Sequence, residues 1–173
     1  MSMKTKLMSE TKIKVSYNDE YEFWKLWRRT CHLMVRARVT EVSRFRISPI
    51  QAGVLMFLKE STEPCTPSEI SRWLMREPQA VSQLLDRMKK QGLVTKTKDS
   101  KRKNMVRVKM TEKGEEIYHG IRKIKICQKV LNNLTQAERE TLWRALEKIQ
   151  DMTIQELLKK NQLRFLLAQN TER

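Results

Sequence analysis

The sequence predicts a mainly α-helical protein with one small β-hairpin. Residues that break helices are scarce, since the 173 residues include only four Gly and four Pro. Several segments repeat apolar residues at steps of three and four, and the two-residue period of a strand occurs on both sides of one polar loop. An apolar share of 39% with 32% charged residues is enough for a core and favours long amphipathic helices over a thick sheet sandwich.

A long helix is expected near the start of the chain. Asn18-Asp19 followed by Glu22 is a helix-start pattern, and helical apolar spacing continues to about residue 45. The apolar positions on this helix are Trp24, Trp27, Cys31, Met34 and Val35. Ser48-Pro49 then starts a second helix that runs through Leu58, because Pro suits a first helical turn.

Two short helices follow. Thr66-Pro67-Ser68-Glu69 is a capping box with Thr66 as the N-cap, and it starts the first of them. A break at Arg76-Glu77-Pro78 opens the second, which Gly92 ends. One face of this second helix carries a buried stripe, formed by Val81, Leu84, Leu85 and Met88. The opposite face is polar and holds Gln79, Gln83, Asp86 and Lys90, with Ser82 and Arg87 on its flanks.

The strand-like alternation lies in 93–97 and again in 106–110. Between these strands, Lys98 to Asn104 contains no apolar side chain. Two short helices joined by a tight turn and followed by a hairpin with a basic loop form a winged helix-turn-helix. The fold predicted is therefore a winged helix-turn-helix domain flanked by N- and C-terminal dimerisation helices.

The charge distribution points to a polyanionic partner. The formal net charge is +16, and the segment Arg87–Lys109 holds ten basic residues against one acid, Asp99. Such a run is often only a solvated surface, but a strong local positive field more often marks a nucleic acid or an anionic membrane. No run of 18 apolar residues is present, so a membrane-spanning segment is not expected.

The second short helix suits the major groove of double-stranded DNA, which admits one α-helix. Gln79, Ser82, Gln83 and Arg87 have side chains suited to reading base edges there. Asp86 does not fit this row, and it is expected to pair with Arg87 or Lys90. Taken alone, this pattern of residues would equally fit an ordinary amphipathic surface helix. Wing and phosphate contacts are expected from Ser68, Lys96, Lys101, Arg102, Lys103 and Asn104.

The stretch from Ile47 to Gly120 resembles the winged-helix domain of the MarR family of regulators. The matching pieces are SPIQAGVLMFL, TPSEISRWL, QAVSQLLDRMKKQGLV and MVRVKMTEKGEE. The resemblance implies a homodimer, a palindromic operator and recognition helices about 34 Å apart. Where the family's wing usually reads Asp-Arg-Arg, this chain has Arg102-Lys103-Asn104. We therefore expect the wing to supply charge, with Arg102 entering the minor groove.

Three parts of the chain are expected: an arm and dimerisation helix (1–46), the DNA-binding domain (47–114) and C-terminal dimerisation helices (115–173). Apolar residues in the first and last parts exceed what a domain of about seventy residues can cover. Pairing of the termini of two subunits would bury them. A tail after Asp151 is expected to extend that interface. Trp24, Trp27 and Phe45 are expected to line a crevice for a small-molecule effector.

Other chemistries have weaker support. Cys31 beside His32 resembles the peroxide-sensing branch of the family, although its place on the apolar stripe favours a buried, inert thiol. His32, His119 and the three cysteines lack metal-ligand spacing, so no metal and no cofactor is expected. No catalytic motif is visible, and the protein is not expected to be an enzyme. An odd number of widely spaced cysteines and the lack of an apolar secretory segment indicate the cytoplasm.

The sequence therefore predicts a dimeric, sequence-specific regulator of transcription that binds double-stranded DNA, with repression relieved by a ligand or signal. Two alternatives remain. A sequence-tolerant architectural DNA-binding protein would use the same charges without an operator, and a redox sensor would depend on the Cys31 thiol.

Overall fold

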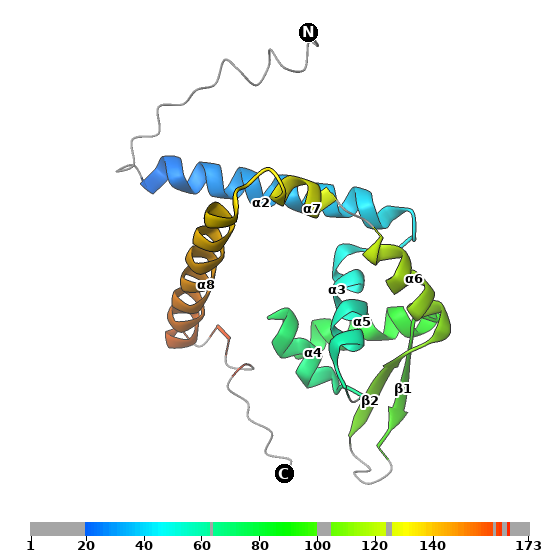
Figure 1. The fold of residues 1–173 in the computed structure, drawn as a ribbon. Coiled ribbons are helices and arrows are strands. Elements are labelled where there is room, and N and C mark those ends of the chain that lie inside the picture. The colour runs from blue at the N-terminus through cyan, green and yellow to red at the C-terminus, as the bar shows by residue number, and fades with distance from the viewer. Residues whose placement is uncertain are drawn as a thin grey trace. The chain divides into compact units, whose positions relative to one another are not determined.

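The computed structural model describes residues 20–62, 64–99, 105–123, 126–160, 162–163 and 166. It confirms a mainly α-helical fold with one antiparallel hairpin (Figure 1). The chain divides into two compact units, Met1–Ala37 and Arg38–Arg173. The elements in order are α2 (Glu20–Ser43), α3 (Pro49–Glu60), α4 (Pro67–Leu74), α5 (Pro78–Lys90), β1 (Val94–Lys98), β2 (Val106–Met110), α6 (Glu112–Arg122), α7 (Ile126–Leu131) and α8 (Gln136–Lys159).

Capping boxes fix where several helices begin. In α4 the Thr66 hydroxyl accepts a hydrogen bond from the Glu69 N–H at 3.2 Å, and the Glu69 carboxylate accepts from the Thr66 N–H at 2.6 Å. This is the cap that the sequence predicts. Ser48 begins α3 in the same way, with Gln51 as its partner. Each box satisfies two backbone N–H groups that the helix itself leaves without acceptors.

The turn between α4 and α5 is tight and partly strained. Met75 ends α4 in the left-handed region, with φ of 51° and ψ of 44°, which a residue with a Cβ adopts at some cost. Beneath it, the buried Ser71 hydroxyl donates to the carbonyl of Arg76. The Met75 N–H also donates to the Arg72 carbonyl at 3.1 Å. These bonds hold the two helices at a fixed angle, and Pro78 starts α5 in its first turn.

The hairpin pairs β1 with β2 from Val94↔Met110 to Lys98↔Val106. Cys65 adds a bridge on the other edge of β2, where the Val108 N–H donates to the Cys65 carbonyl at 2.7 Å. The hairpin is therefore tied to the loop that precedes α4. This tie gives the base of the hairpin a fixed place on the domain.

One core holds α3, α4, α5, α6 and the hairpin together. The predicted stripe of α5 faces this core, since its four residues are at most 4% exposed. α3 packs against α4, α6 and β2, and α5 packs against α4 and β1. The buried apolar residues of the core are Val42, Ile47, Ala52, Val54, Leu55, Cys65, Ile70, Val81, Leu84, Leu85, Met88, Leu93, Val94, Val108, Tyr118 and Ile121.

The end of α2 is bonded to the start of α7 through a buried carboxylate. Glu41 is 5% exposed, and its Oε1 accepts from the Ile126 N–H at 2.7 Å. Its Oε2 accepts from Arg38 Nη1 at 3.0 Å, so the charge is paired. A buried carboxylate is stable only with such partners. Glu41 therefore joins the two segments that flank the winged domain.

Two long helices present apolar side chains to solvent. Within 20–37, Phe23 and Trp27 stack with ring centroids 6.3 Å apart, and Trp24 is 57% exposed. None of the residues of α8 is buried. The exposed apolar side chains of α8 are Leu142, Trp143, Leu146, Ile149 and Met152.

Candidate nucleic-acid interface

The outward face of α5 is polar, as the sequence predicts. Gln79, Gln83 and Arg87 are exposed, and Ser82 is half-buried. Their outward direction follows from the inward stripe, because residues three and four apart share a helix face. Gln91 closes the helix with its N–H donating to the Arg87 carbonyl at 3.0 Å, and Gly92 follows with φ of 72°. A left-handed residue of this kind favours glycine and turns the chain into β1.

Asp86 lies in the same outward row, but its partner differs from the prediction. The Lys96 Nζ donates to Asp86 Oδ1 at 2.6 Å, so the ion pair crosses from α5 to β1. Arg87 and Lys90 were expected because they are neighbours along the helix. The chain instead reverses at Gly92, and β1 carries Lys96 back beside Asp86. This hydrogen bond, with the charge of Lys96, lowers the pKa of the Asp86 carboxyl from its ordinary value.

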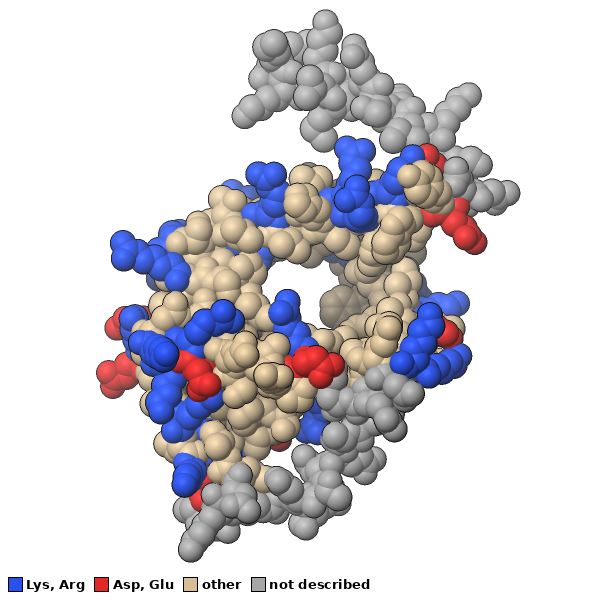
Figure 2. All heavy atoms as spheres, turned by 180° about the vertical axis from the view of Figure 1, so that it is seen from behind, with Lys and Arg blue, Asp and Glu red and all other residues tan. Residues whose placement is uncertain are grey.

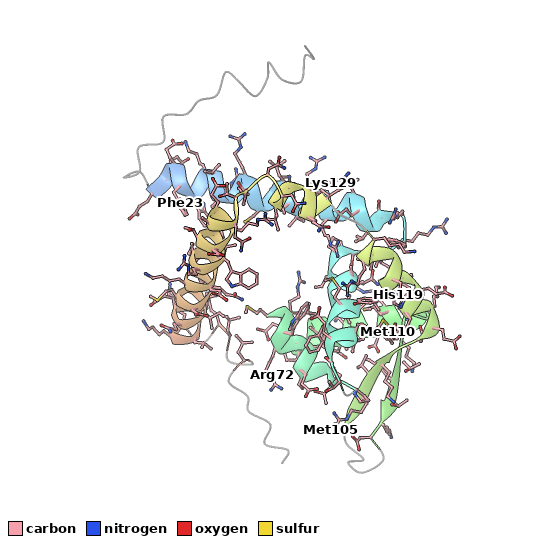
Figure 3. All side chains as sticks on the ribbon, viewed as in Figure 1. Phe23, Arg72, Met105, Met110, His119 and Lys129 are labelled. Carbon is pink, nitrogen blue, oxygen red and sulfur yellow. The ribbon has the colours of Figure 1, made fainter. Side chains whose placement is uncertain are left out.

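The base of the hairpin loop carries a second ion pair. Arg107 Nε donates to Asp99 Oδ2 at 2.7 Å, and Arg107 Nη1 donates to the Pro64 carbonyl at 3.1 Å. The Asp99 N–H also donates to the Met105 carbonyl at 2.8 Å, which closes the loop. Figure 3 labels Met105, which precedes β2, and Met110, which ends it. Sequence reasoning missed this brace, although the opposite charges of Asp99 and Arg107 on either side of the loop could have indicated it.

The other residues expected to contact phosphate differ in their surroundings. Ser68 is exposed in the first turn of α4, a position where backbone N–H groups attract anions. Lys96 is engaged with Asp86, and its side chain is only 16% exposed. Lys101, Arg102, Lys103 and Asn104 lie outside the described residues. Lys and Arg side chains also lie over much of the face seen in Figure 2, with acids between them.

The residues expected at an effector or redox site lie in both units. Trp24, Trp27 and Cys31 belong to the 20–37 segment of α2, whereas Phe45 belongs to the second unit. Phe45 packs on the core against Gly120, and the Arg44 guanidinium lies 4.7 Å from its ring centroid. Cys31 is exposed, so the expectation of a buried thiol is wrong.

Metal and membrane sites find no support in the described part of the chain. Its His, Cys, Asp and Glu side chains form no group of three that could hold a metal ion. Its helices include none that is long and apolar enough to cross a membrane.

Comparison with known proteins identifies the winged domain. Residues 47–103 match the model of the MarR family. The winged domain is therefore similar to that of the MarR family. This match covers α3, α4, α5 and β1, which present the polar face of α5 and begin the wing.

Solved structures of regulators share the fold over most of the chain. The organohalide-sensing transcriptional regulator RdhR, free of ligand, is 26% identical with a TM-score of 0.70, and the match covers 83% of this chain and 90% of that one. The DNA complex of S. aureus MepR has a TM-score of 0.71 at 21% identity, covering 76% and 97%. The transcriptional regulator SlyA has a TM-score of 0.69 at 17% identity, covering 78% and 95%. No curated protein matches the sequence.

Proposed function

We propose that this chain is a sequence-specific regulator that binds double-stranded DNA as a homodimer, with α5 in the major groove. The polar row of α5, exposed above a fully packed opposite face, carries this proposal. A helix packed in this way can enter a groove without unfolding its own domain. Gln83 and Arg87 offer the planar donors and acceptors that pair with adenine and guanine. The MepR neighbour was solved bound to DNA, which supports the same use of the shared fold.

The wing supplies a second contact in this proposal. Its base is held by the Asp99–Arg107 pair and by the bond to Pro64. Residues 101–104 and the α4 end at Ser68 are proposed to meet phosphates on either side of the groove. Phosphate contacts position the protein, and base contacts on α5 specify the sequence.

The proposed homodimer is supported by the apolar side chains that a single chain leaves exposed. On α8, Leu142, Leu146 and Ile149 recur at helical spacing and are each about 40% exposed. The aromatic residues Tyr21, Phe23 and Trp24 of α2 are exposed as well. A second copy, with the parts 1–46 and 115–173 as its dimerisation segments, would bury both surfaces. Sedimentation or light scattering should give a dimer, and deletion of 155–173 should weaken it.

A small-molecule effector that releases the DNA completes the proposal. RdhR was solved with 2,4-dichlorophenol, so a phenolic panel is a reasonable first set. Ligands that raise the melting temperature should also lower operator affinity, since binding stabilises the form it prefers. Cytoplasmic location and a repressing role belong to the same proposal.

The deciding experiment is selection of bound duplexes from a random pool. A regulator should enrich a palindrome and prefer it to random DNA by about 10³-fold or more. Gln83→Ala and Arg87→Ala should each cost about 1–3 kcal/mol at that site and change the preferred base. Equal losses on random DNA, or no enriched site, would instead favour an architectural protein.

The thiol offers a second candidate, because Cys31 is exposed. An exposed thiol is open to oxidants, whereas a buried one is not. Peroxide should then release operator DNA from the wild type but not from Cys31→Ser. Equal behaviour of the two proteins would leave the regulator without a role for this thiol.

A further inference from the structure

Asp86 interrupts a basic and amide surface with a carboxylate. It lies three residues after Gln83 and seven after Gln79, so it shares their helix face. Its side chain is 58% exposed, while that of its partner Lys96 is 16% exposed. The pair thus has an acid facing outward and an ammonium held against the protein. Because this carboxylate is exposed, packing in the core does not explain why position 86 carries an acid.

A carboxylate in this row affects DNA binding in two ways. It repels the phosphates of any duplex that approaches the face of α5. It also restrains Lys96 through a bond of 2.6 Å, so this ammonium is withheld from phosphates. Both effects weaken binding to every sequence. Weak binding to random DNA raises the ratio of operator affinity to random-DNA affinity. A regulator depends on this ratio because the genome offers a large excess of competing sites.

The carboxylate also has one favourable partner in the major groove. Asp and Glu accept a hydrogen bond from the exocyclic N4 amino group of cytosine. We propose that Asp86 is a specificity-determining residue, which opposes binding to random DNA together with Lys96 and accepts a hydrogen bond from cytosine in the operator. This inference rests on the proposed function, since it assigns a role within the same DNA-binding face.

Asp86→Asn tests the inference, because asparagine keeps the shape but loses the charge. Affinity for a random duplex should rise by roughly three- to tenfold, and the dependence of log K on log salt should steepen by about 0.9, the value of one added phosphate contact. Affinity for the operator should gain less or fall, and selection should lose its cytosine preference at one position. Asp86→Ala is a second variant with the same expected direction on random DNA.

Two further proteins separate this mechanism from a general charge effect. Glu116→Gln removes one acid from the exposed surface of α6 and should leave the salt slope unchanged. Lys96→Gln alone should change random binding little, because Asp86 already holds this ammonium. In the Asp86→Asn background it should remove the steeper salt slope and the part of the gain in affinity that come from the freed ammonium. Such non-additivity is expected for residues in direct contact.

The outcomes are distinct. If the wild type selects an operator but Asp86→Asn matches Glu116→Gln in slope and affinity, the inference is wrong and the proposed function stands. If the wild type binds no duplex, the proposed function and the inference both fall. Circular dichroism of each variant checks that the fold is kept.

Discussion

Replacement of Gly114 by alanine should destabilise the winged domain and displace the wing. Gly114 lies in the first turn of α6, where its N–H donates to the Thr111 hydroxyl at 3.1 Å. A Cβ at this position would meet the Leu93 carbonyl oxygen at 2.3 Å and Met110 Cγ at 2.6 Å. The Met110 side chain can move aside. The Leu93 carbonyl is backbone, and it already accepts from the Thr111 N–H at 3.1 Å.

The magnitude follows from three contributions. Overpacking of a filled site costs about 1–3 kcal/mol, and loss of the bond between Thr111 and Leu93 costs about 1 kcal/mol. The helix propensity of alanine over glycine offsets about 1 kcal/mol. Gly114→Ala should therefore lower the free energy of unfolding by about 1–3 kcal/mol. Leu93 connects α5 to β1, so the same shift should also weaken DNA binding.

Urea denaturation followed by circular dichroism measures this change, with Gly53→Ala as a matched control. A Cβ at Gly53 would meet nothing closer than the Trp73 ring at 3.5 Å, which is an ordinary contact. Gly53→Ala should thus stabilise the protein by up to about 1 kcal/mol through helix propensity. Equal stability of the two variants would refute the close approach at Gly114.

Further changes test the caps, the wing and the pH response. Thr66→Ala should cost about 1 kcal/mol of unfolding free energy, read by urea titration, because it removes the α4 cap. Arg107→Met should break the bond to Asp99 and weaken binding to all duplexes, measured by fluorescence anisotropy, with little change in base preference. Alanines at 101–103 should lower the salt slope of binding by up to about 3, or 0.9 per lost phosphate contact. The Thr135 backbone hydrogen bond lowers the pKa of Glu138 from its ordinary 4.5. The stabilisation of α8 by this carboxylate should therefore be complete above pH 4.5 and be lost as the pH falls through the lowered, folded-state pKa. In a pH titration of helicity, Glu138→Gln should remove this part of the change.

Local patterns in the sequence predicted most of the winged domain. The Val81–Met88 stripe, the capping box at Thr66 and the glycine after α5 each depend on residues within one or two turns, so the chain itself contains the information. The predicted partner of Asp86 was wrong, because the observed ion pair with Lys96 depends on how β1 folds back after Gly92. The bond from Arg107 to Pro64 crosses 43 positions and left no periodic signal.

The long helix shows a second limit of sequence reasoning. Apolar spacing on α2 indicates an apolar face, but spacing does not say what covers it. The stripe continues into Val42, which is fully buried, whereas Cys31 on the same helix is exposed. Burial along a helix therefore changes where its neighbours end, and those neighbours come from distant segments.

The bond between Glu41 and Ile126 bears on how a working DNA-binding fragment would be excised from this protein. A fragment of residues 47–114 would discard Val42 along with Tyr118 and Ile121, leaving a gap in its interior. A cut anywhere between α6 and α7 would leave Glu41 as an acid without its backbone donor. The smallest autonomous fragment should therefore begin at or before Arg38 and continue past Ile126, so that any chimera keeps the end of α2 and the start of α7 together with the winged domain.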